Sequence, residues 1–121
     1  MNANLLIVDD DPAIRLLFSD YFAGIGWRVD AASEKEEGLA LLTCCEYQAV
    51  VSDLRLSRHS LSDGLEIINF ARARFPAALI VACTGYGDAD LSVQARHNGA
   101  SEVILKPVPL AALDRIFRRQ G

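Results

Sequence analysis

Apolar residues gather in five short runs, and longer stretches with helical spacing follow each run. Every run has the length of a β-strand. The runs lie at residues 4–8, 27–31, 48–52, 78–83 and 102–105. The pattern therefore predicts five strands that alternate with five helices.

The first helix has the clearest signal of the five. Its apolar side chains recur at the i, i+3, i+4, i+7 spacing of one helix face, at Ile14, Leu17, Phe18 and Tyr21. Asp11 stands directly before Pro12, an order typical of an N-cap followed by a first-turn proline. We expect Asp11 to cap this helix rather than to bind a metal ion.

The other helices are bounded by weaker signals. They are expected at 33–44, 63–75 and 88–98, and in a last segment with Leu110, Leu113 and Phe117 on one face. Ser33 and Glu36 resemble a capping box at the start of the second helix. Pro76 ends the third helix, because a proline disfavours helical geometry in the residue before it. Gly99 is expected as a left-handed cap after the fourth.

Strands that alternate with helices predict an α/β fold. The crossovers are right-handed, so the sheet is mostly parallel and is covered by helices on both faces. The uninterrupted apolar runs "LLIV" and "LIVAC" agree, because strands buried on both faces have this character. The connection "LRLSRHSLS" is longer than usual for a loop of this kind, which is typical of functional loops.

Composition narrows the class of protein. A chain of 121 residues, 51% of them hydrophobic, fits a single globular domain, expected over residues 1–121. The net charge of −4 argues against a nucleic-acid or acidic-membrane surface. Cys44 and Cys45 are adjacent and Cys83 lies in an apolar run, so no disulfide framework is evident and a reducing cytoplasm is expected. No apolar run approaches the roughly 18 residues that span a bilayer.

Polar side chains directly follow four of the predicted strands. They are Asp9 and Asp10, Asp53, Thr84 and Lys106. Ligands of open α/β sheets bind outside the carboxyl ends of the strands, where these side chains would meet. Carboxylates suit Mg²⁺, and an ionised Asp is a competent nucleophile toward phosphorus. A lysine and a hydroxyl can neutralise and hydrogen-bond a transferring phosphoryl group.

Four motifs occur in the order "LLIVDDDP", "VVSDLRL", "VACTGYGD" and "VILKPV". Together they resemble the receiver domain of two-component response regulators over essentially the whole chain. The resemblance implies a flavodoxin-like, doubly wound parallel sheet of order 2-1-3-4-5 with helices on both faces. It also implies that Asp9 and Asp10 are the metal-binding acidic pair, Asp53 the phospho-acceptor, Thr84 the switch hydroxyl and Lys106 the cation.

The resemblance has further implications for the site and its partners. The backbone carbonyl of Arg55 would complete the Mg²⁺ shell beside Asp53, and the bond between Lys106 and Pro107 would be cis. A sensor histidine kinase or phosphotransfer protein would donate the phosphoryl group. Self-catalysed phosphoryl transfer and autodephosphorylation would be the only chemistry. An effector domain or a second copy would bind the face formed by the fourth helix, fifth strand and fifth helix, without direct contact with nucleic acid or a membrane.

The sequence departs from the family pattern in two places. Val103 occupies the position where the family usually has an aromatic switch residue, so Tyr86 is a candidate for part of that role. Because a bulky Tyr86 would hinder an attacking water, a fairly persistent aspartyl phosphate is expected. The loop after Asp53 lacks a common proline and is about three residues longer than in the family pattern, which suggests an unusual metal shell or partner surface.

Two other functions stay open on sequence grounds. One is a receiver-like binding module that phosphorylation does not regulate, which Val103 and the altered loop leave possible. The other is a haloacid-dehalogenase-like phosphatase, for which Asp9 and Asp11 have the required spacing. That enzyme class usually needs a cap domain, for which this chain has no room, and it would leave Asp53 without a role.

Overall fold

Five parallel strands alternate with five helices in the computed structural model, which describes residues 3–56, 62–85 and 88–119. Within these residues the elements are β1 (Asn4–Val8), α1 (Pro12–Gly24), β2 (Arg28–Ala32), α2 (Lys35–Cys44), β3 (Ala49–Asp53), α3 (Asp63–Arg74), β4 (Leu79–Thr84), α4 (Ala89–His97), β5 (Glu102–Leu105) and α5 (Leu110–Arg119). Every predicted element is present, and the five strands and the helices α2, α3 and α4, for which bounds were predicted, lie within two residues of them.

The strands form one sheet in the order β2-β1-β3-β4-β5, with parallel pairing throughout. Both the α/β class and the predicted strand order are therefore confirmed. Residues 5–8 of β1 and the whole of β4 are buried, as the uninterrupted apolar runs "LLIV" and "LIVAC" indicated, and β3 is buried along its whole length as well. The chain runs from β1 outward to β2 and then crosses to β3 on the other side of β1, which opens a crevice at the carboxyl ends of β1 and β3.

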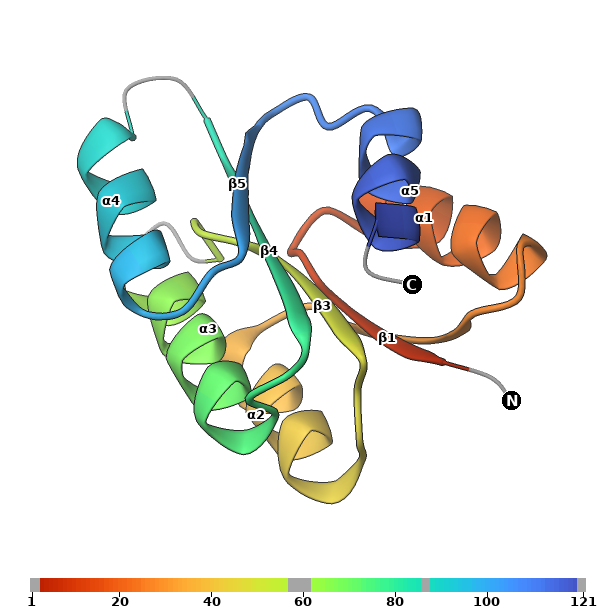
Figure 1. Ribbon diagram of the computed structural model, residues 1–121, viewed down its shortest axis with the longest axis horizontal. Coiled ribbons are helices and arrows are strands. Elements are labelled where there is room, and N and C mark those ends of the chain that lie inside the picture. The colour runs from red at the N-terminus through yellow and green to blue at the C-terminus, as the bar shows by residue number, and fades with distance from the viewer. Residues whose placement is uncertain (1–2, 57–61, 86–87, 120–121) are drawn as a thin grey trace.

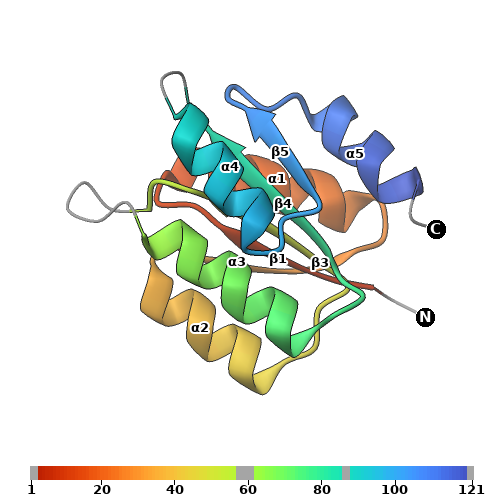
Figure 2. The same ribbon diagram turned by 60° about the vertical axis from the view of Figure 1, so that its left-hand side comes forward.

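Helices cover the two faces of the sheet (Figures 1 and 2). On one face lie α1 and α5, and on the other lie α2, α3 and α4. Each face has its own core: Phe22 and Phe117 meet on the first with ring centroids 5.0 Å apart, and Ile67 and Ile68 are fully buried on the second. In the described part of the chain, every helix is too short or too polar to cross a membrane.

Asp11 caps α1 as predicted. Its side-chain Oδ1 accepts the backbone N–H of Ala13 at 2.9 Å, and Pro12 is the first helical residue. The predicted apolar face is only partly correct, since Phe18 is buried but Leu17 is 51% exposed. Phe22, one turn beyond Phe18, fills the core position instead, because the two residues four apart lie on the same face of the helix.

The predicted capping box of Ser33 and Glu36 is wrong. The helix α2 begins at Lys35, with Glu34 as N-cap and no capping bond from its side chain. Glu37 rather than Glu36 reaches back, and its Oε1 accepts the backbone N–H of Ser33 at 2.7 Å. The helix starts later than the capping-box pattern assumed, which moves the first-turn acceptor by one residue.

Gly64 places the start of α3 against the end of β3. A Cβ at this position would lie 2.5 Å from the Cα of Leu54 and 2.6 Å from the backbone oxygen of Asp53. Glycine is required where two backbone segments approach this closely. The contact fixes the first turn of α3 against the strand exit that carries Asp53.

Replacing Gly64 with alanine is expected to lower the free energy of unfolding by about 1–3 kcal/mol, because the added methyl group meets backbone that cannot move aside locally. Gly24→Ala is the matched control: an added Cβ there meets nothing within 4 Å, so its stability should be unchanged or slightly higher. Urea unfolding followed by circular dichroism measures both. Equal stabilities of the two variants would contradict the close approach.

Candidate functional site

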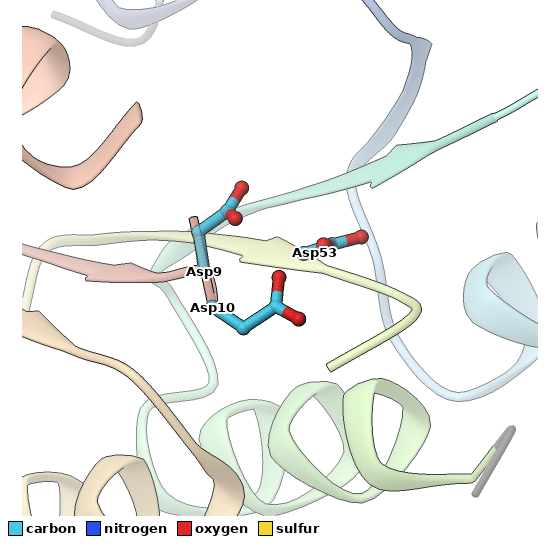
Figure 3. A group of neighbouring side chains, drawn as sticks. All are labelled: Asp9, Asp10 and Asp53. Atoms are coloured by element: carbon cyan, nitrogen blue, oxygen red, sulfur yellow. The ribbon is translucent and has the colours of Figure 1, made fainter. Parts of the chain in front are cut away.

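Three carboxylates meet at the carboxyl ends of β1 and β3 (Figure 3). Asp9 and Asp10 follow β1 directly, and Asp53 is the last residue of β3. One carboxylate oxygen from each lies within 4.8 Å of the others. Asp9 and Asp53 are only 4% and 6% exposed, whereas Asp10 is exposed. The structure thus brings the predicted acids together in a partly buried cluster.

Backbone groups orient the two buried carboxylates. The N–H of Asp11 donates to Oδ1 of Asp9 at 2.9 Å, and the N–H of Arg55 donates to Oδ1 of Asp53 at 3.0 Å. The Arg15 guanidinium bonds the backbone oxygen of Asp9 at 2.8 Å. One oxygen of each buried carboxylate is therefore held by the chain just beyond its strand.

Lys106 supplies positive charge to the cluster. Its Nζ lies 3.0 Å from Oδ2 of Asp53 and 3.3 Å from Oδ2 of Asp9. Its backbone N–H donates to the carbonyl of Thr84 at 2.7 Å, which ties the exit of β5 to that of β4. The peptide bond between Lys106 and Pro107 is cis, in agreement with what the motif implied.

Burial and charge oppose each other at Asp53. Burial raises the pKa of its carboxyl group, hydrogen bonding to Lys106 and the Arg55 N–H lowers it, and the charge of Asp9 raises it again, with a net shift upward. For Lys106, burial lowers the pKa, but the bonds and charges of Asp53 and Asp9 outweigh burial and raise it. Three carboxylates thus lie around a single ammonium that contacts two of them, so the cluster has less positive than negative charge.

A hard divalent cation fits this charge deficit. Carboxylates, backbone carbonyls and water are the ligands that Mg²⁺ and Ca²⁺ take, and a site with one or two carboxylates suits Mg²⁺. Asp9, Asp10 and Asp53 offer three oxygens within reach of a single ion. Within the described residues this is the one group of three or more metal-ligating side chains so placed.

The Thr84 hydroxyl is engaged away from the acids. It donates to Oδ2 of Asp88 at 3.3 Å, and the Arg55 guanidinium bonds the same carboxylate, with its Nε 2.9 Å from Oδ2. The hydrogen bonds from Arg55 lower the pKa of Asp88. Sequence reasoning missed Asp88 and the contact that the Arg55 side chain makes with it. An acid four residues after a strand-exit threonine was the available signal, but its partner lies 33 positions away.

The other predicted site residues have mixed outcomes. Val103 lies in β5, partly buried, and packs against the core on the α2, α3 and α4 face. Tyr86 lies outside the described residues. Cys83 is buried beside the site as expected, and burial raises the pKa of its thiol to about 12.

Comparisons with known proteins agree with this arrangement. Residues 5–118 match the family model described as response regulator receiver domain. The response regulator protein FleR of Pseudomonas aeruginosa is 31% identical over 121 residues, which cover all of this chain and 25% of FleR. The chain thus spans about a quarter of the length of this curated relative.

Solved structures show the same fold. A CheY-like response regulator receiver domain protein from Methanospirillum hungatei is 28% identical and superposes with a TM-score of 0.88, over 99% of this chain and 94% of that one. A response regulator from Burkholderia pseudomallei is 24% identical with a TM-score of 0.83, over 99% of this chain and 74% of that one. The latter was solved with a phosphorylated aspartic acid, a calcium ion and citrate.

The raised pKa of Asp53 makes stability depend on pH. A folded-state pKa above the ordinary value of 3.8 favours the folded state at low pH, and this contribution is lost as the pH rises through the folded-state pKa. Without divalent cations, Asp53→Asn should therefore gain stability relative to the unmodified chain as the pH rises from about 3.8 to neutrality. Urea unfolding in chelator across this pH range measures the difference.

The exposed Asp20→Asn substitution on α1 is the control and should show no such trend. A stability difference between Asp53→Asn and the unmodified chain that stays constant with pH would contradict the assignment.

Proposed function

The chain belongs to the response regulator receiver domain family, and on that premise we propose that it is a phosphorylation-controlled signalling switch whose phospho-acceptor is Asp53. The observation that carries the proposal is the position of the Asp53 carboxylate. It is buried at a strand exit, 3.0 Å from the Lys106 ammonium and within 4.8 Å of oxygens of Asp9 and Asp10.

In the proposed reaction, a carboxylate oxygen of Asp53 attacks phosphorus. A bond forms between this oxygen and phosphorus, and the bond from phosphorus to the donor breaks, with its electron pair leaving on the donor atom. Asp9, Asp10, Asp53 and the carbonyl of Arg55 would hold Mg²⁺, which supplies positive charge to the phosphoryl oxygens when bound. The protein contributes mainly position, since Asp53 is already oriented by the Arg55 N–H.

Lys106 and Thr84 are placed to bind the phosphoryl group on Asp53. The ammonium already contacts Asp53, so it can bond a phosphoryl oxygen with a small movement and neutralise charge that develops there. The Thr84 hydroxyl sits at the exit of the neighbouring strand β4 and can donate to another phosphoryl oxygen once it leaves Asp88. These two groups convert a charge change at Asp53 into movement of the segments after β4 and β5.

The proposed phosphoryl donor is a phosphohistidine on a histidine kinase or phosphotransfer protein. Leu16 and Leu17 on α1 are 64% and 51% exposed, and Leu17 lines a cavity next to Asp9 and Lys106. Exposed apolar residues beside a reactive site mark a protein contact. They support docking of the donor over α1, with its histidine directed at Asp53.

The proposed output surface is the face formed by α4, β5 and α5. Val93 on α4 and Leu105 on β5 are 69% and 44% exposed. This surface adjoins Lys106, so the phosphoryl group can influence it directly. An effector domain or a second copy of the chain would bind there.

The second acid that the phosphatase hypothesis requires has another role in this structure. Asp11, which would serve two residues after Asp9, is the cap of α1 and bonds the N–H of Ala13. Family membership and the position of Asp53 favour a receiver, which is not a conventional enzyme. Whether Asp53 accepts a phosphoryl group distinguishes the switch from the unregulated binding module.

Incubation with acetyl phosphate and Mg²⁺ is expected to add one phosphoryl group to the intact chain, at Asp53. Intact-mass spectrometry detects the adduct, and borohydride reduction followed by peptide mapping locates the aspartyl phosphate. Asp53→Asn should show none, while Asp20→Asn should behave as the unmodified chain. An unmodified mass after incubation would favour the unregulated binding module. Repeated turnover of a generic phosphate ester would favour the phosphatase. Loss of the adduct within seconds would contradict the expected persistence of the aspartyl phosphate.

Mg²⁺ is expected to stabilise the chain by binding the three acids. At a hundred-fold excess over its dissociation constant, a ligand specific to the folded state adds about 2.7 kcal/mol to the free energy of unfolding. Thermal unfolding with and without Mg²⁺ measures this gain. Asp10→Asn should lose most of it without lower stability in chelator, because Asp10 is exposed, whereas Asp20→Asn should keep it. Equal gains in both variants would contradict the site.

A further inference from the structure

Asp88 stands at the N-cap of α4, yet its side chain does not cap the helix. The carboxylate turns inward, is 6% exposed, and accepts the Thr84 hydroxyl at 3.3 Å and the N–H of Gly85 at 3.4 Å. The guanidinium of Arg55 bonds both of its oxygens, with Nε at 3.0 and 2.9 Å. Its backbone carbonyl accepts the N–H of Ser92 at 2.9 Å, so Asp88 also belongs to the first turn of α4.

The Thr84 hydroxyl can serve only one charged acceptor at a time. A hydroxyl has one hydrogen to donate, and here that hydrogen points to Asp88. Any bond from Thr84 to a phosphoryl oxygen on Asp53 must therefore break the bond to Asp88. The Asp88 carboxylate and a phosphoryl group on Asp53 would therefore compete for the same donor.

Arg55 contacts both the acceptor Asp53 and its competitor Asp88. Its backbone N–H bonds Asp53 while its half-exposed side chain bonds Asp88. A phosphoryl group adds negative charge and further acceptor oxygens at Asp53, which attract both the guanidinium and the hydroxyl. Asp88 would then keep only the Gly85 N–H, and a buried carboxylate with so few donors is costly. Asp88 must move toward solvent, and the first turn of α4 moves with it.

We propose that Asp88 is a positioning residue that holds Thr84 in the unphosphorylated arrangement, and that its release on phosphorylation moves the start of α4. The proposal rests on the proposed function, since it supplies the regulation of that same site. In this chain the ion pair of the buried Asp88 with the half-exposed Arg55 takes the place of the aromatic switch residue that Val103 replaces. The conformational change would then begin when the Asp88 carboxylate loses its hydrogen-bond donors, rather than when an aromatic side chain changes rotamer.

The test uses beryllium fluoride, a phosphoryl mimic, with Mg²⁺ and the whole chain, followed by amide NMR. Asp88→Asn keeps the shape but removes the charge, which weakens the bonds to Thr84 and Arg55. Loss of a charge-assisted bond is expected to lower the dissociation constant for beryllium fluoride roughly ten-fold. Without the mimic, the amide peaks of Gly85 and Ser92 should already be displaced toward their bound positions.

Two further variants test whether the effect is specific to Asp88. Asp90→Asn, two residues further along α4 and exposed, should match the unmodified chain in both readouts. Arg55→Ala removes the guanidinium that holds Asp88 inward, so the amide peaks of Gly85 and Ser92 should be displaced toward their bound positions in this variant too, without the mimic. Unchanged or weaker binding by Asp88→Asn, with amide peaks at their original positions, would overturn the role of Asp88. Failure of the unmodified chain to bind the mimic would instead overturn the proposed function.

Discussion

The contact between the Lys106 ammonium and the carboxylates of Asp9 and Asp53 is the interaction on which the site depends. Two buried carboxylates at neighbouring strand exits repel each other and are poorly solvated, and Lys106 offsets this only in part. The remaining deficit of positive charge makes the cluster receptive to a divalent cation, whose charge would then favour an anionic phosphoryl group beside Asp53. The repulsion between these carboxylates lowers the stability of the fold at the residues that are proposed to carry the reaction.

The parallel sheet makes this contact possible. Four site residues are far apart in the sequence, but each lies at the carboxyl end of a strand, and the strands all point the same way, so the four meet at one edge of the sheet: Asp9, Asp53, Thr84 and Lys106. Burial of β3 and β4 on both faces leaves little freedom for those exits. The close approach at Gly64 fixes α3 against the same edge.

The strand pattern and the strand-exit residues were sufficient to predict the α/β class and the acidic cluster, because both depend on local periodicity and on one topological rule, whereas the strand order was implied by the resemblance to receiver domains. Details that depend on tertiary contacts were not predictable in this way. Leu17 has the helical spacing of a core residue, yet Phe22 fills the core, and the acceptor at the start of α2 is Glu37. The pair of Arg55 and Asp88 joins two loops that only the folded chain brings together.

The anchoring of Gly64 has a consequence for how such a domain diversifies. The backbone is fixed on one side by Asp53 and Leu54 and on the other by the first turn of α3, which lies directly against them. Insertions in the segment between these two anchors therefore leave the reactive carboxylate in register. A change of length or sequence between the two anchors is thereby mechanically separated from the position of the Asp53 carboxylate.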